Sequence, residues 1–154
     1  FSYTALELEC HVIGMFAPSF FTGNLIMRFG TLPVMGVGIA LYLGCIAIAL
    51  SGVDLHQFLI ALFLLGVGWN FVFTGSTTLS LTAYRPEEKD RAQGALNFFV
   101  FATLALSSLA SGVLVTTQGW TLLNQGSLLP VLATALALLW LVLHRRRAQN
   151  PVSN

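Results

Sequence analysis

Long uninterrupted runs of apolar residues follow one another along this chain, separated by short polar segments. Each run has about the 20 residues that a helix needs to cross the hydrocarbon core of a bilayer. No run alternates polar and apolar residues with the period of two that marks a half-buried strand. Because a segment in hydrocarbon must pair its own backbone amides, each run predicts a helix. We expect an all-α membrane protein, a bundle of five transmembrane helices at residues 11–27, 32–50, 55–83, 92–116 and 123–143.

Short segments with turn-forming residues join these helices. Three of the segments contain a glycine: Gly30, Gly52 and Gly119. The longest segment, residues 84–91, reads YRPEEKDR, and its Pro86 suits the first turn of a helix. We therefore expect the fourth helix to begin in water and then to enter the membrane. Pro18 lies inside the first span and predicts a bend there.

The composition agrees with a membrane protein and excludes several other classes. Of the 154 residues, 56% are hydrophobic and only 8% are charged, whereas a soluble domain carries about a quarter charged residues. Thirteen charged side chains cannot coat a soluble core of this size, and a net charge of +1 gives no basic field for nucleic acid. Cys10 and Cys45 have no metal-ligand spacing, and no catalytic motif is present. We therefore predict a protein that is not an enzyme and has no metal or cofactor.

The positions of the charges predict the orientation. All seven basic residues fall in three places: Arg28; Arg85, Lys89 and Arg91; and Arg145, Arg146 and Arg147. With five spans these places share one side of the membrane, opposite Glu7, Glu9 and Asp54. By the positive-inside rule the N-terminus of this segment lies outside, and residues 144–154 form a cytoplasmic tail. Because the chain begins at a phenylalanine, we expect it to be a fragment of a longer protein.

The helix at residues 55–83 carries an unusual polar stripe. At 100° per residue, one narrow face holds Gly66, Asn70, Thr74 and Thr77, with Trp69 at its edge. One interpretation is that the stripe holds a neighbouring helix by hydrogen bonds, each worth about 1 kcal/mol or less. The other is that it lines an aqueous pathway in which Asn70 contacts a transported solute. The position of Asn70 near the membrane midplane favours the pathway, because transporter sites tend to lie at that depth.

Small residues predict how other helices pack. In the second span, Gly36, Ala40 and Gly44 recur at a spacing of four, which indicates a packing ridge. In the fourth span the pairs Ser107/Ser111 and Ser108/Gly112 have the same spacing and the same meaning.

A family resemblance rests on the segment GNLIMRFG at Gly23–Gly30, which joins two spans. It resembles the conserved loop of the major facilitator superfamily, roughly G-x-L-x-D-R-x-G-R-R. Four positions match: Gly23, Leu25, Arg28 and Gly30. Met27 stands where the family has an acidic residue, and Thr31 and Leu32 replace the final basic pair. Other segments, among them LLGVGWNFVFTGSTTL, also look like the C-terminal half of bacterial members.

The resemblance implies that the five helices correspond to helices eight to twelve of a twelve-helix transporter. The tenth helix of that family lines the central cavity, which implies a substrate pathway along Trp69, Asn70, Thr74 and Thr77. The implied cytoplasmic gate comprises Gly23, Arg28, Gly30, Glu88, Arg91 and Asn97.

The resemblance also implies a function. We expect part of a secondary active transporter in a bacterial inner membrane, with the N-terminus of this segment periplasmic. It would move a small solute by alternating access with proton coupling, paired with a missing N-terminal half. The alternative is a non-catalytic membrane subunit or scaffold, complete at five helices, whose polar helix face docks a partner.

Overall fold

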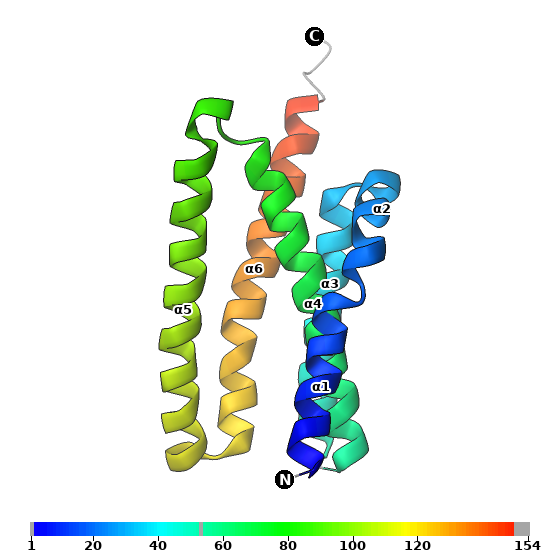
Figure 1. Ribbon diagram of the computed structural model, residues 1–154, viewed down its shortest axis with the longest axis vertical. Coiled ribbons are helices and arrows are strands. Elements are labelled where there is room, and N and C mark those ends of the chain that lie inside the picture. The colour runs from blue at the N-terminus through cyan, green and yellow to red at the C-terminus, as the bar shows by residue number, and fades with distance from the viewer. Residues whose placement is uncertain (1, 53, 150–154) are drawn as a thin grey trace.

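The computed structural model describes residues 2–52 and 54–149, and within them every regular element is helical (Figure 1). The elements are α1 (Ser2–Phe16), α2 (Ser19–Phe29), α3 (Thr31–Ser51), α4 (Leu55–Leu81), the short 3-10 helix η1 (Pro86–Glu88), α5 (Lys89–Gln118) and α6 (Trp120–Gln149). Five stretches of the described chain are long and apolar enough to cross a membrane, and α1 and α2 together form the first. The predicted all-α membrane fold is confirmed.

The predicted helices are present; four of the spans extend beyond the predicted bounds, whereas α4 begins at Leu55 as predicted and ends at Leu81, before residue 83. The first span begins at Ser2 and is interrupted at Pro18, so the predicted bend divides one span into α1 and α2. The last helix begins at Trp120 and continues to Gln149. The predicted tail is therefore helical as far as Gln149, and residues 150–154 lie outside the described residues.

The closest packing joins α3 to α4. A Cβ atom built on Gly38 lies 3.0 Å from the carbonyl oxygen of Gly68, and one built on Gly68 lies 3.0 Å from the carbonyl oxygen of Gly38. These two glycines therefore let the helix backbones touch. Of the ridge predicted on α3, a Cβ on Gly44 lies 4.0 Å from the Leu64 side chain of α4, whereas Ala40 is exposed and a Cβ on Gly36 meets nothing within 4 Å. The closest contact with α4 is at Gly38 instead, and packing along the full ridge stays a prediction.

The remaining helices lie beside this pair. α1 packs along α4, whereas α5 contacts α6 and α6 contacts α3 (Figure 1). The indole N–H of Trp120 donates to the carbonyl oxygen of Ala49 at 3.0 Å, which ties the start of α6 to the end of α3. Large apolar side chains along α5 are exposed, among them Phe98, Phe101 and Leu109. This surface is suited to lipid or to a further helix.

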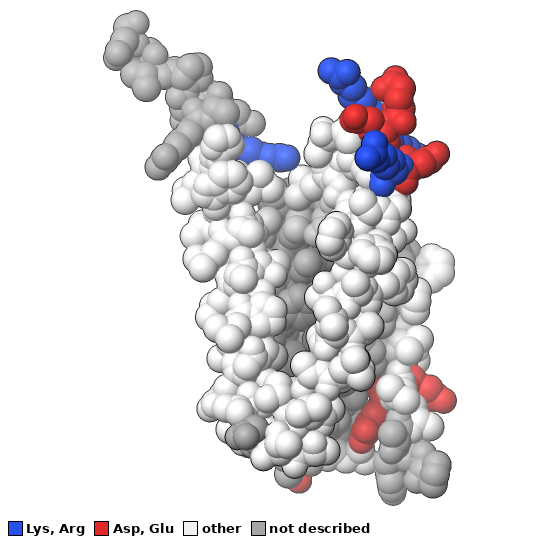
Figure 2. All heavy atoms as spheres, turned by 90° about the vertical axis from the view of Figure 1, so that its left-hand side faces the viewer, with Lys and Arg blue, Asp and Glu red and all other residues white. Residues whose placement is uncertain are grey.

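The charged side chains gather at the ends of the helices. Figure 2 shows Lys and Arg at one end only of the visible face, with acidic residues beside them and others near the opposite end. The long faces between these ends are uncharged in this view, as hydrocarbon requires. Which side of the membrane the basic end faces stays a prediction.

Candidate functional site

The break in the first span is caused by Pro18. Proline has no backbone N–H, and its ring clashes with the carbonyl group four residues earlier in a helix. The backbone hydrogen bonds that flank the break run from Ala17 N–H to Ile13 O at 2.8 Å and from Thr22 N–H to Pro18 O at 2.8 Å. The carbonyl oxygen of Met15, at the end of α1, accepts instead from a side chain of α4.

That side chain belongs to Asn70, which is 5% exposed. Its amide nitrogen donates to Met15 O at 2.7 Å and to Ser19 Oγ at 2.6 Å. Its amide oxygen accepts from the hydroxyl of Thr22 at 2.6 Å, and Thr22 is fully buried. An amide group has two N–H donors and one carbonyl acceptor, so all of these groups are used. Asn70 therefore connects α4 to both halves of the broken span.

Two glycines bring α1 close enough for this network. A Cβ built on Gly66 of α4 lies 2.5 Å from the carbonyl oxygen of His11, and one built on Gly14 of α1 lies 2.7 Å from the carbonyl oxygen of Phe63. Neither contact leaves room for a side chain, because both neighbours are backbone atoms. Where α1 and α4 touch, the Nδ1 atom of His11 also forms a hydrogen bond with the carbonyl oxygen of Leu62, at 3.0 Å.

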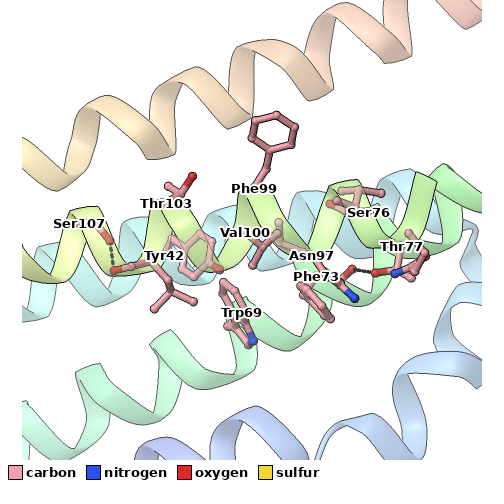
Figure 3. Close-up of a pocket in the computed structure, with 14 residues that line it drawn as sticks. Tyr42, Trp69, Phe73, Ser76, Thr77, Asn97, Phe99, Val100, Thr103 and Ser107 are labelled. Atoms are coloured by element: carbon pink, nitrogen blue, oxygen red, sulfur yellow. Dashed lines mark hydrogen bonds between the residues drawn. The ribbon is translucent and has the colours of Figure 1, made fainter. Parts of the chain in front are cut away.

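A cavity of about 500 Å³ opens on another side of α4, between α4 and α5 (Figure 3). Its walls come from α3 (Tyr42), α4 (Trp69, Val72, Phe73, Ser76, Thr77) and α5 (Gln93, Leu96, Asn97, Phe99, Val100, Thr103, Leu104, Ser107). The Trp69 and Phe73 rings stack, with centroids 5.2 Å apart and planes 15° from parallel. None of the described residues that line the cavity carries a charge. The cavity thus combines aromatic faces with neutral hydrogen-bonding groups.

The family of the chain follows from comparison with known proteins. Residues 6–154 match the Major Facilitator Superfamily. The chain belongs to this superfamily of transporters. The resemblance predicted from the Gly23–Gly30 segment is confirmed, and no solved structure matches the chain.

Three related transporters were found. The chain is 43% identical over 122 residues to the riboflavin transporter RfnT of Brucella anthropi, covering 79% of this chain and 31% of that protein. It is 30% identical over 134 residues to the uncharacterized MFS-type transporter YddS of Bacillus subtilis, covering 85% and 31%. It is 31% identical over 121 residues to the uncharacterized MFS-type transporter YdeG of the same organism, covering 77% and 28%. The chain thus spans about three tenths of the length of these relatives.

The structure separates the predicted pathway residues of this superfamily member into two groups. Trp69 and Thr77 line the cavity, whereas Asn70 and Thr74 do not. Asn70 faces the break in the first span, and the carbonyl oxygen of Thr74 accepts from Thr78 within α4. Solute contact by Asn70 stays a prediction, but its amide already has partners in this conformation.

The predicted gate residues also differ in their surroundings. Asn97 lines the cavity, and its role in a gate stays a prediction. Gly30 has φ +89°, a conformation that side chains rarely adopt, and its N–H donates to Ile26 O at 2.9 Å to end α2. Arg28 lies over the Phe29 ring at 5.4 Å. Gly23 is exposed with open space at its Cβ position.

The other two gate residues precede and begin α5. Glu88 ends η1, where its N–H donates to Arg85 O at 3.0 Å, and Arg91 is exposed in the first turn of α5. Among the described residues, no three His, Cys, Asp or Glu side chains lie close enough to hold a metal ion.

The α5 wall of the cavity is what sequence reasoning missed. Gln93, Asn97, Val100, Thr103 and Ser107 recur every three or four residues, which is the spacing of one helix face. The spacing of Ser107 favoured a role in helix packing, and this polar face of α5 was therefore not recognised from the sequence. In the structure the Ser107 hydroxyl donates to Leu104 O at 3.1 Å within α5, and the Ser107 side chain is exposed.

Proposed function

We propose that this chain is the cavity-lining part of a secondary transporter that moves a small, uncharged, planar solute by alternating access. The observation that carries the proposal is the neutral, aromatic cavity between α4 and α5. Its volume of about 500 Å³ falls within the usual range for small-molecule sites. The relative that is named as a riboflavin transporter supports a fused-ring solute of this kind.

The wall chemistry suits such a solute. Stacked aromatic side chains favour another flat ring offset against them, which adds about 0.5–1.5 kcal/mol beyond burial of area. Trp69 and Phe73 present such a surface from α4. The amide of Asn97 and the hydroxyl of Thr103 offer donors and acceptors from α5 to the polar edge of the ring system. A strongly charged solute finds no counter-ion among the described lining residues.

The setting of the proposal is a bacterial inner membrane, with the N-terminus of this segment periplasmic and its C-terminal end cytoplasmic. The gathering of Lys and Arg at one end supports this orientation. Because the match covers only 31% of the riboflavin transporter, we propose that a further, N-terminal half covers the exposed face of α5 and closes the cavity. Proton coupling is part of the proposal, with the proton-binding carboxylate supplied by that half, since no Asp or Glu lines the cavity in the described chain. The family match favours a transporter over a scaffold.

Replacing Trp69 by alanine tests the cavity. We expect the KM for riboflavin uptake by the full-length protein in proteoliposomes to rise about tenfold, because the stacking surface is lost. The matched control is Trp140→Ala, since Trp140 lies exposed on α6 and stacks on His144 instead. An unchanged KM in Trp69→Ala, or no riboflavin uptake by the unmodified protein, contradicts the proposed substrate class. Uptake that persists after a protonophore collapses the gradient contradicts proton coupling.

A further inference from the structure

A second hollow lies between α3 and α6 and takes no part in the transport cavity. It has a volume of about 580 Å³ and is lined by apolar side chains, among them Pro33 of α3 with Leu139 and Val142 of α6. Gly36 forms part of its α3 wall, and a Cβ built there meets nothing within 4 Å. At one end the lining changes abruptly to Arg145 and Arg146.

The two arginines stand where an apolar span ends. The membrane-spanning part of α6 extends from Trp120 to Arg146, so both guanidinium groups lie at its last positions. Figure 2 places Lys and Arg side chains at that end of the visible face and none along the spans. No acidic residue lines the hollow in the described chain, so nothing in its wall neutralises the two charges. The hollow is therefore apolar at hydrocarbon depth and cationic at the depth of lipid headgroups.

We propose that this groove binds one anionic phospholipid. The guanidinium groups of Arg145 and Arg146 bind the headgroup phosphate, because the planar fork of arginine matches two phosphate oxygens at once. An acyl chain lies along the apolar wall and fills the space left by Gly36. A soluble phosphate ion would use the arginines but not the apolar length of the groove. A partner helix would use the apolar length and bury two unpaired charges.

The site is separate from the proposed transport pathway. The transport cavity is walled by α4 and α5, whereas the groove is walled by α3 and α6. The two hollows share no lining residue, so the lipid can be removed without touching the solute contacts. This separation allows the lipid proposal to fail or succeed independently of the riboflavin proposal.

The test is lipid retention by the full-length protein, measured by native mass spectrometry. The purified protein is exchanged into detergent with equal amounts of phosphatidylglycerol and phosphatidylethanolamine that carry the same acyl chains. We expect preferential retention of one phosphatidylglycerol. In Arg145→Gln/Arg146→Gln this retention should fall about tenfold or more, because both phosphate contacts are removed. The control Arg85→Gln/Lys89→Gln removes two cations from the segment that begins α5 and should leave retention unchanged.

A second variant keeps the test decisive if the arginine variant does not fold. A Cβ atom at Gly36 meets no neighbour within 4 Å, so we expect Gly36→Leu to keep the fold while its side chain fills the space for the acyl chain. We expect it also to lose the retained phosphatidylglycerol. Equal retention of the two lipids by the unmodified protein overturns the proposal. So does retention in Gly36→Leu or in the folded arginine variant that equals the unmodified protein.

Discussion

Asn70→Leu is expected to lower the thermal stability of the full-length protein and to reduce transport, even though Asn70 does not line the cavity. The substitution removes an amide that bonds to Met15, Ser19 and Thr22 across the break in the first span. The Thr22 hydroxyl keeps a partner, because Pro18 O already lies 2.8 Å from it. Met15 O loses the side-chain donor that the structure gives it, and leaving a desolvated polar group unpaired costs about 1–3 kcal/mol.

The transport defect follows from loss of the connection between α4 and the broken span. Because α4 carries Trp69 on its cavity side, a change in the position of α4 misplaces the proposed stacking surface. We expect a lower maximal rate and a lower melting temperature together in Asn70→Leu. If Asn70 touched the solute instead, the KM would change while the melting temperature stayed close to that of the unmodified protein.

A double-mutant cycle separates the two roles further. Asn70→Leu combined with Thr22→Val should show a coupling energy of about 0.5–2 kcal/mol in unfolding, because both residues belong to one network. The control pair is Asn70→Leu with Thr78→Val, since the Thr78 hydroxyl donates to Thr74 O in its own helix at 2.8 Å. Additive effects in both pairs contradict the network.

The sequence was sufficient for the spans and for the break. Apolar length predicts a membrane helix because hydrocarbon leaves a backbone no other partner, and Pro18 interrupts a helix by its own covalent structure. Neither property depends on where other helices lie. For this reason the all-α fold and the interrupted first span followed from local features.

The neighbours that each side chain of α4 faces could not be predicted from local sequence features. The helical repeat places Asn70 and Thr77 on one stripe, but it does not say which neighbour faces each part of a helix of 27 residues. In the structure Asn70 faces the broken span and Thr77 faces the cavity. Both interpretations of the stripe therefore hold for part of it: Asn70 attaches α4 to a neighbouring helix, and Thr77 forms part of the cavity wall.

The closest packing position on α3 could not be predicted for a related reason. This helix contains small residues on several faces, and spacing alone selects Gly36, Ala40 and Gly44 as readily as any other set. The face that meets α4 contains Gly38, because Gly68 lies opposite it. A close contact needs small residues on both helices, and one sequence without its neighbours does not show which pairs meet.

Gly66→Ala is expected to be among the most damaging single changes in the chain. The added methyl group would lie 2.5 Å from the carbonyl oxygen of His11 and 2.9 Å from the backbone nitrogen of Met15. Both are backbone atoms of α1, so no flexible side chain can move aside, and α1 itself must shift. Overpacking of this kind typically costs about 1–3 kcal/mol.

The shift also affects the Asn70 network, which lies one turn further along α4. Moving α1 away from α4 stretches the 2.7 Å contact between Asn70 and Met15 O, so overpacking and loss of a hydrogen bond act together. We expect the melting temperature of the full-length protein to fall by more than in Asn70→Leu, and transport to be lost. The measurement is thermal unfolding in detergent, followed by uptake in proteoliposomes.

The matched control is Gly126→Ala in α6. Its Cβ position has no neighbour within 4 Å, and alanine is favoured over glycine inside a helix by about 1 kcal/mol. We expect a melting temperature equal to or slightly above that of the unmodified protein. A Gly66→Ala protein as stable as Gly126→Ala would contradict the close crossing of α1 and α4. It would also remove the geometric basis for the bridge from Asn70, because that bridge requires the two helices to touch at Gly66.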